Sequence, residues 1–175
     1  MEKVVVIGAG QAGSSLVAKL RNSGFDGAIT LIGAEHAPPY QRPPLSKKYL
    51  LGDMDVERLF LRPASFYADN AIDLHLSETA ISIDRATQQV VTDGQTLPYD
   101  HLVLATGSQP RLLPAAIGGT LGNVFTMRDL NDADAMAPQF SAGRNLLVIG
   151  GGYIGLEAAA VAASKGLHVT LVEMS

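Results

Sequence analysis

Uninterrupted apolar runs that end in glycine-rich loops are the main pattern of this chain. Val4-Val5-Val6-Ile7 contains no polar position, which is typical of a strand buried on both faces in a parallel sheet. Leu16, Val17 and Leu20 follow with helical spacing, and residues 28–32 form a second apolar run. Strand, helix and strand within about 30 residues predict a βαβ unit at the start of the chain.

The same pattern returns near the end of the sequence. Residues 146–149 predict a buried strand, the helical spacing from Ile154 to Lys165 predicts a helix ended by Gly166, and residues 169–172 predict its partner strand. We therefore expect a second βαβ unit.

Between these units the pattern changes. Short alternating stretches around Asp93-Gly94, a strong hairpin signal, predict an antiparallel β-meander. Residues 102–105 predict another fully buried parallel strand. The proline-rich segment 38–50 is expected to form either a rigid surface loop or the wall of a ligand site. The other expected elements are a short helix from Pro44 to Leu50, a short helix within residues 59–70 that is opened by Pro63, and a helix at 128–137. Strands are expected at 72–76, 80–84, 89–92 and 96–97.

Both βαβ units contain the pattern G-x-G-x-x-G between the first strand and the helix. In the first copy, Gly8 allows a tight turn, Gly10 lets a pyrophosphate approach the backbone, and Gly13 lets the helix pack closely on the sheet. The free N–H groups and the dipole at the helix start favour a diphosphate. One copy is weak evidence, but two copies in this context predict two dinucleotide sites.

An acidic residue about 20 residues beyond the last glycine usually binds the ribose hydroxyls of a dinucleotide. Glu173 stands in that place, directly after the last strand. In the first unit Gly33 occupies the corresponding position, so Glu35 is the candidate, against an ordinary solvated glutamate. If this loop binds a nicotinamide dinucleotide, the Glu173 carboxylate repels the 2′-phosphate of NADPH and predicts a preference for NADH.

Composition narrows the function further. The chain has 175 residues, is 47% hydrophobic and carries a net charge of −4, which is typical of a globular protein and argues against binding to nucleic acid. It contains no cysteine, which excludes a redox dithiol, and its four histidines show no metal-ligand spacing. No apolar run reaches the ~20 residues of a membrane span, so we expect a cytoplasmic protein without a membrane segment.

The predicted fold class is α/β. A Rossmann-like domain with an inserted antiparallel β-meander is expected at residues 1–112, followed by the start of a second Rossmann-like domain at residues 113–175. The boundary is placed near residue 112 because the segment from Ser108 to Pro114 is typical of a linker. Both domains are expected to be incomplete.

Four segments, at residues 4–13, 39–47, 99–107 and 150–157, resemble the flavoprotein pyridine-nucleotide oxidoreductases, and more narrowly the ferredoxin reductases that serve oxygenases. Pro43-Pro44-Leu45-Ser46-Lys47 is the most discriminating stretch. The resemblance implies a truncated glutathione-reductase-like fold, with FAD on the first glycine loop and NAD(H) on the second.

The resemblance also implies site residues. Those for FAD are Gly8, Gly10, Ala12, Gly13, Glu35, Arg42, Pro44, Lys47, Ala80, Thr106, Gly107 and Arg128. Those for NAD are Gly150, Gly152, Tyr153, Ile154, Gly155 and Glu173. Family members often carry an aspartate where this chain has Ala34, which leaves Glu35 to contact the FAD ribose.

Lys47 and Glu157 are the implied catalytic pair beside the flavin N5 atom. A lysine there stabilises the negative charge of reduced flavin, and a carboxylate holds the lysine in place. The simpler alternative for Glu157 is an acidic residue favoured by the dipole at a helix N-terminus.

The resemblance implies hydride transfer from NADH to FAD, then single-electron transfer to a [2Fe–2S] ferredoxin of a P450 or ring-hydroxylating oxygenase. Alternatives are a rubredoxin or nitrite reductase flavoprotein module, or a non-turnover flavin-binding protein resembling apoptosis-inducing factor. Related enzymes are about twice as long, so weak FAD binding and no catalysis are expected if these 175 residues are the whole polypeptide. The sequence identifies neither the cognate ferredoxin nor the oligomeric state.

Overall fold

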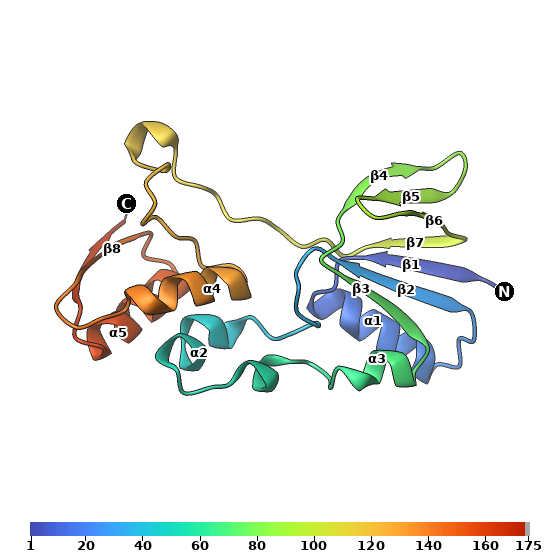
Figure 1. Ribbon diagram of the computed structural model, residues 1–175, viewed down its shortest axis with the longest axis horizontal. Helices are drawn as coiled ribbons and strands as arrows, with labels where there is room; N and C mark the ends of the chain where they lie inside the picture. Colours follow the sequence, from blue (N-terminus) through green and yellow to red (C-terminus); the bar gives the residue numbers. More distant parts are fainter. Residues whose placement is uncertain (174–175) are drawn as a thin grey trace. The chain divides into compact units, whose positions relative to one another are not determined.

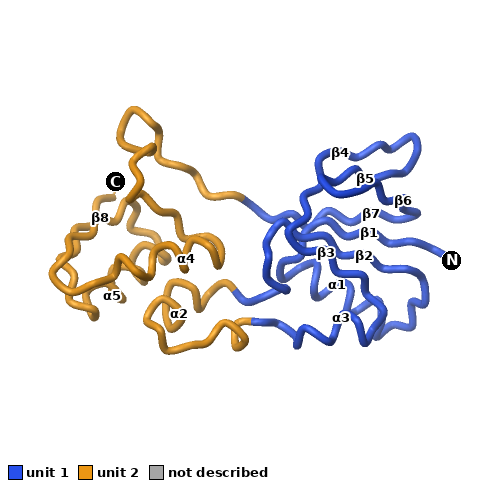
Figure 2. Tube along the Cα trace, viewed as in Figure 1, with its two compact units in different colours: residues 1–41, 60–108 blue, residues 42–59, 109–175 orange. Residues whose placement is uncertain are grey.

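The computed structural model describes residues 1–173 of the chain (Figure 1). These residues form two compact units, each described by itself below (Figure 2). The first unit consists of Met1–Gln41 and Phe60–Ser108, and the second of Arg42–Leu59 and Gln109–Ser175.

A four-stranded parallel sheet with the order β3-β2-β1-β7 forms the centre of the first unit. The expected strands are confirmed as β1 (Lys3–Ile7), β2 (Ala28–Gly33), β3 (Ile72–Leu76) and β7 (His101–Leu104). In this register Val5 lies between Thr30 of β2 and Leu102 of β7. The central strand β1 therefore has a neighbour on each side.

Both faces of this sheet are covered, which explains the uninterrupted apolar run in β1. Val4 and Val6 pack on the side of α1 (Gln11–Asn22) and α3 (Ser65–Asp69). Val5 and Ile7 pack on the opposite side with Val90 of the meander. Figure 1 shows the helices on one face and the meander on the other. The meander consists of β4 (Ala80–Asp84), β5 (Gln89–Thr92) and β6 (Thr96–Pro98) in antiparallel order.

One expectation for the first unit is wrong. The strand at residues 102–105 is not fully buried, because β7 lies at an edge of the sheet and Leu104 is 63% exposed. The short helix expected within residues 59–70 is present as α3, which begins at Ser65, shortly after Pro63. Before it, Phe60 forms a β-bridge with Tyr40, and Leu61 N–H donates to the Pro39 carbonyl at 2.9 Å.

The second unit contains the repeated strand–helix–strand motif. The strands β8 (Asn145–Ile149) and β9 (His168–Val172) pair in parallel, and α5 (Tyr153–Ser164) joins them. Only one face of β8 is covered: Leu146 packs against the core, whereas Leu147 is 57% and Ile149 60% exposed. The expectation of a buried strand is therefore wrong for half of its side chains.

Residues 42–59 contribute to the core of the second unit. They contain η1 (Pro43–Ser46), α2 (Lys48–Leu51) and η2 (Val56–Leu59). Leu50 of α2 packs with Met136 of α4 (Leu130–Met136) and Val161 of α5. Two single 3₁₀ turns, η3 (Ala115–Ile117) and η4 (Ala137–Gln139), complete the described elements. The functional division at residue 112 stays a prediction. No helix within residues 1–173 is long and apolar enough to cross a membrane.

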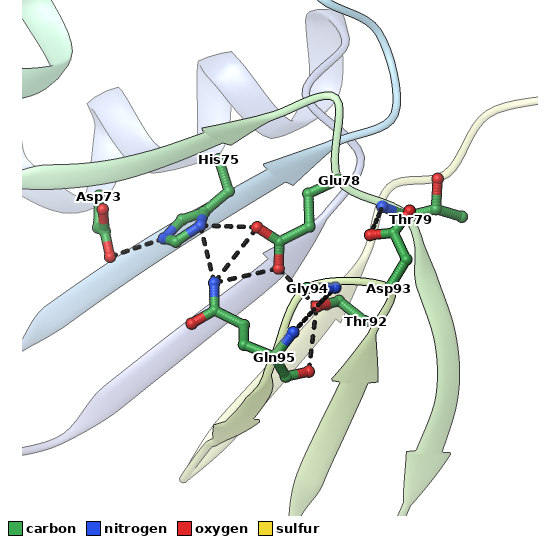
Figure 3. Close-up of polar contacts among 8 residues, drawn as sticks. All are labelled: Asp73, His75, Glu78, Thr79, Thr92, Asp93, Gly94 and Gln95. Carbon is green, nitrogen blue, oxygen red and sulfur yellow. Dashed lines mark hydrogen bonds and ion pairs between the residues drawn. The ribbon is translucent and has the colours of Figure 1, made fainter.

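A polar network joins β3 to the meander (Figure 3). His75 contacts two carboxylates, Asp73 Oδ2 through Nε2 and Glu78 Oε2 through Nδ1, both at 2.8 Å. The hydroxyl of Thr92 donates to Glu78 Oε1, and Gln95 Nε2 donates to the same carboxylate. Burial alone would lower the pKa of His75, but the bonds with Asp73 and Glu78 outweigh it and raise that pKa.

This network makes the stability of the first unit depend on pH. Because the pKa of His75 is raised in the folded state, its stabilisation is complete below the pKa of an unfolded histidine and is lost as the pH rises through the folded value. We expect His75→Gln to destabilise the protein by about 1 kcal/mol near pH 6 and by less near pH 9, measured by urea unfolding. His36→Gln is the control for removal of an exposed histidine. A loss that is equal at both pH values would contradict the role of the network.

Candidate functional site

The first glycine loop connects β1 to α1, and two of its glycines are required by the protein itself. Gly8 has a φ of +118°, and a Cβ there would lie 2.1 Å from the carbonyl oxygen of Ala105. A Cβ on Gly13 would lie 2.0 Å from the carbonyl oxygen of Gly8. These contacts bring the start of α1 and the residues after β7 close to the end of β1.

Gly10 has no such explanation within the chain. Its backbone is extended, with a φ of −94°, and no atom lies within 4 Å of the position of a Cβ. Gly152 in the second loop is also extended and equally open. Each residue caps a helix without a side-chain hydrogen bond, and neither helix has an acidic residue in its first turn. An open glycine at an uncapped helix start fits a dinucleotide diphosphate.

The second loop repeats the geometry of the first. Gly150 N–H donates to the carbonyl of Val172 at 2.9 Å, as Gly8 N–H donates to Ile32 at 2.8 Å. A Cβ on Gly155 would lie 2.1 Å from the Gly150 carbonyl oxygen, matching the contact between Gly13 and Gly8. Gly33, the last residue of β2, and Glu173, the residue after β9, therefore occupy equivalent positions.

The two loops differ in one reciprocal pair of residues. In the second loop, Glu173 accepts a hydrogen bond from the backbone N–H of Gly151, so its carboxylate lies against the loop. In the first loop, Ala9 replaces Gly151, and a Cβ on Gly33 would lie 2.5 Å from the Ala9 methyl group. The Ala9 side chain therefore explains why no acidic residue stands at position 33, the end of β2.

Glu35 is held two residues further along. It accepts a hydrogen bond from the buried hydroxyl of Tyr40 through Oε2, and its carbonyl accepts from Ser77 N–H at 3.0 Å. These bonds fix the half-buried carboxylate near the end of β2. A contact between Glu35 and a ribose stays a prediction.

The other predicted FAD residues of the first unit lie around this edge of the sheet. Ala12 is exposed in the first turn of α1, and Thr106 and Gly107 follow β7 beside the turn at Gly8. Ala80 begins β4, and the residues before it are tied to β2 because Glu78 N–H donates to the Gly33 carbonyl at 3.0 Å. The structure thus gathers these residues near the carboxyl ends of the parallel strands, where α/β sheets bind ligands.

A cavity of about 220 Å³ in the second unit collects most of the remaining predicted residues. It is lined by Arg42, Pro43, Leu45, Ser46, Lys47, Met127, Arg128, Ile154 and Glu157. Pro44 belongs to the same 3₁₀ turn but does not line the cavity. Tyr153, which is 89% exposed, precedes Ile154 at the start of α5. We call this space the Lys47 cavity.

Lys47 and Glu157 lie in direct contact in this cavity. Lys47 Nζ is 2.7 Å from Glu157 Oε2 and also donates to the Pro43 carbonyl at 3.1 Å. The hydrogen bonds from Lys47 and then Ser46 lower the pKa of the Glu157 carboxyl group. The ion pair expected from the resemblance is therefore present, whereas its catalytic role stays a prediction.

Arg42 and Arg128 also line the cavity. The Arg42 guanidinium donates to the Arg128 carbonyl at 2.8 Å. Arg128 N–H in turn donates to Asp132, which forms a capping box with Asp129 at the start of α4. The helix cap thus fixes the segment that carries Arg128.

Four residues of this cavity were not predicted from the sequence. Pro43, Leu45, Ser46 and Met127 were not among the predicted site residues. Three of them belong to the Pro-Pro-Leu-Ser-Lys stretch, and Met127 precedes Arg128. Each of the four is adjacent in sequence to a predicted site residue, and this adjacency is the signal by which it could have been found.

The glycines of the first loop can be separated by substitution. We expect Gly8→Ala to lower the free energy of unfolding of the ligand-free protein by more than about 2 kcal/mol, because its Cβ meets a carbonyl oxygen at a positive φ. Gly10→Ala should cost less than about 1 kcal/mol, because its backbone is extended and its surroundings are open. Urea unfolding of both variants tests this, and equal losses would contradict it.

Comparisons with known proteins agree with this architecture. Residues 2–175 match the family described as pyridine nucleotide-disulphide oxidoreductase. The chain is 47% identical over 171 residues to rhodocoxin reductase of Rhodococcus erythropolis, covering 97% of this chain and 40% of that protein. It is 45% identical over 175 residues to putidaredoxin reductase of Pseudomonas putida, covering 98% and 42%.

Solved structures show the same relationship. The covalent putidaredoxin reductase–putidaredoxin complex matches with a TM-score of 0.92 at 44% identity, covering 97% of this chain and 42% of that chain. The ferredoxin reductase of the CYP199A2 system from Rhodopseudomonas palustris matches with a TM-score of 0.92 at 40% identity, covering 100% and 43%. The chain thus spans about two fifths of the relatives that it matches. With its two glycine loops and its α/β fold, the chain belongs to the pyridine nucleotide-disulphide oxidoreductase family.

Proposed function

We propose that this chain is the dinucleotide-binding part of an NADH:ferredoxin oxidoreductase, with FAD on the first glycine loop and NAD(H) on the second. The observation that carries the proposal is the presence of two equivalent glycine loops in one chain. Two dinucleotides in one protein imply electron transfer between a nicotinamide and a flavin.

The open glycines support binding of a diphosphate at both loops. Gly10 and Gly152 leave the backbone accessible at the starts of α1 and α5, where no side chain caps the helix. The free N–H groups there donate to anionic oxygens, and the helix dipole adds to the attraction. Ala12 and Gly13 continue the first cradle, and Gly155 continues the second.

The positions of the acidic residues support a different dinucleotide for each loop. Glu173 lies against Gly151, where it can accept hydrogen bonds from both hydroxyls of the NADH ribose. The first loop has no acid at the equivalent position, and Glu35 reaches the FAD ribose from outside it, held by Tyr40. This difference supports NAD(H) on the second loop and FAD on the first.

The Lys47 cavity supplies the charges that a flavin needs. When bound, FAD would supply a hydride acceptor for NADH and a donor of single electrons. The Lys47 ammonium group would stabilise the negative charge of the reduced flavin, and Glu157 keeps that ammonium group in place. Arg42 and Arg128 add positive charge to the lining of the cavity.

The electron acceptor is proposed to be a [2Fe–2S] ferredoxin of an oxygenase or P450 system. The relatives that support this are named rhodocoxin reductase and putidaredoxin reductase, and one relative was solved in complex with putidaredoxin. The absence of cysteine from the chain agrees with electron transfer that uses no dithiol. We place the reaction in the cytoplasm, where NADH is available.

The proposed function is tested on the purified protein that carries this chain. We expect flavin absorbance after purification, reduction of that flavin by NADH, and electron transfer to a [2Fe–2S] ferredoxin. Gly10→Ala should weaken FAD binding about tenfold or more, because its methyl group fills the diphosphate cradle. Transfer to rubredoxin alone, or flavin reduction without transfer to any ferredoxin, would overturn the proposed acceptor, and absence of flavin binding would overturn the whole proposal.

The cofactor preference gives a second test. We expect kcat/KM to be higher for NADH than for NADPH, and Glu173→Gln to reduce this preference about tenfold, because the amide repels a 2′-phosphate less than the carboxylate does. Glu57→Gln, an exposed acidic residue of the same unit, is the control. An unchanged preference in Glu173→Gln would show that Glu173 does not face the ribose.

A further inference from the structure

Ser46 contributes a second hydrogen bond to the carboxylate that holds Lys47. Its hydroxyl donates to Glu157 Oε2 at 2.6 Å, and Lys47 Nζ lies 2.7 Å from the same oxygen. Two donors from adjacent residues therefore converge on one carboxylate oxygen. A carboxylate that accepts a short bond from a hydroxyl loses much of its freedom to rotate.

The two donors differ in how firmly they are held. Ser46 is only 4% exposed, whereas the Lys47 side chain is 46% exposed. A serine side chain also has far fewer rotatable bonds than a lysine and loses less entropy when it is fixed. The exposed ion pair alone is a weak constraint because water competes for the ammonium group. The hydroxyl is therefore the firmer contact to Glu157.

The backbone around Ser46 is rigid. Ser46 ends the 3₁₀ turn η1, which begins with Pro43 and Pro44, and proline fixes the backbone at both positions. Leu45 beside it is buried, and Lys47 N–H donates to the Pro44 carbonyl at 2.9 Å. The turn thus holds the Ser46 hydroxyl at a defined place relative to Glu157 in α5.

We propose that Ser46 is a positioning residue, which fixes the Glu157 carboxylate and through it the Lys47 ammonium group that would stabilise the negative charge of a reduced flavin. This inference rests on the proposed function for its effect on electron transfer. The contact between Ser46 and Glu157 belongs to the chain itself, and it can be tested without flavin.

The first measurement uses flavin-free protein. The pKa of Glu157 is followed by ¹³C NMR of its carboxyl carbon in the wild type and in Ser46→Ala, Ser46→Cys and Ser164→Ala. We expect Ser46→Ala to raise this pKa by about half a unit or more, because a donor to the charged form is lost. Ser46→Cys, which keeps the size but donates weakly, should raise it less. Ser164→Ala, which removes a hydroxyl that donates to the Val161 carbonyl within α5, should leave it unchanged.

The second measurement uses the flavin-loaded protein. Ser46→Ala should slow flavin reduction by NADH about tenfold with little change in the KM for NADH, which corresponds to the loss of one bond to a charged group. The acidic limb of its pH profile should move to higher pH, because Glu157 then protonates at higher pH. A residue with a merely structural role would not move this limb.

The outcomes separate the two proposals. An unchanged Glu157 pKa in both Ser46 variants overturns the role of Ser46, whatever the flavin does. A raised pKa in a protein that binds no flavin supports the contact with Ser46 and overturns the proposed function instead. If Ser46→Ala does not fold, Ser46→Cys decides the first measurement, because its side chain is close in size to serine.

Discussion

The close approach between the glycine loop and the ends of the strands is the constraint on which both units depend. Gly8 turns the chain where a side chain would strike the Ala105 carbonyl group, and Gly13 lets α1 begin directly against that turn. The helix start, the end of β1 and the residues after β7 therefore meet at one point. Gly150 and Gly155 repeat the same turn in the second unit. A ligand cradle thus follows from steric limits on the backbone.

Much of the fold could be predicted from the sequence because its signals are local. The apolar run in β1 reports burial on both faces, and Asp93-Gly94 reports the hairpin of the meander. Burial of β7 and β8 could not be predicted in the same way. Leu104 and Leu147 belong to apolar runs that are typical of buried strands, but their exposure depends on which elements pack over them. Likewise, Leu50 joins the second unit through contacts with residues far away in the sequence.

The candidate site could likewise be predicted only where its signals are local or where the family resemblance supplied them. The glycine loops carry a spacing that is visible in the sequence, and the ion pair between Lys47 and Glu157 was expected from the family resemblance. Ser46 could not be recognised from the sequence. It belongs to no periodic pattern, and a serine in a proline-rich turn can have many roles. Only its burial and its short bond to Glu157 distinguish it. The reason why position 33 carries no acidic residue is the Ala9 methyl group beside it, a contact that the sequence does not reveal.

That last contact has a consequence for how such loops change. The two loops use opposite combinations. The first has Ala9 in the turn and Gly33 at the end of β2, whereas the second has Gly151 in the turn and Glu173 after β9. In the first loop, a glutamate at position 33 meets the Ala9 methyl group unless that methyl group is also removed. The effects of substitution at the two positions are therefore coupled, and their energies do not add. Ribose recognition can therefore be exchanged between such loops only if both residues change together. A single substitution during evolution is not enough.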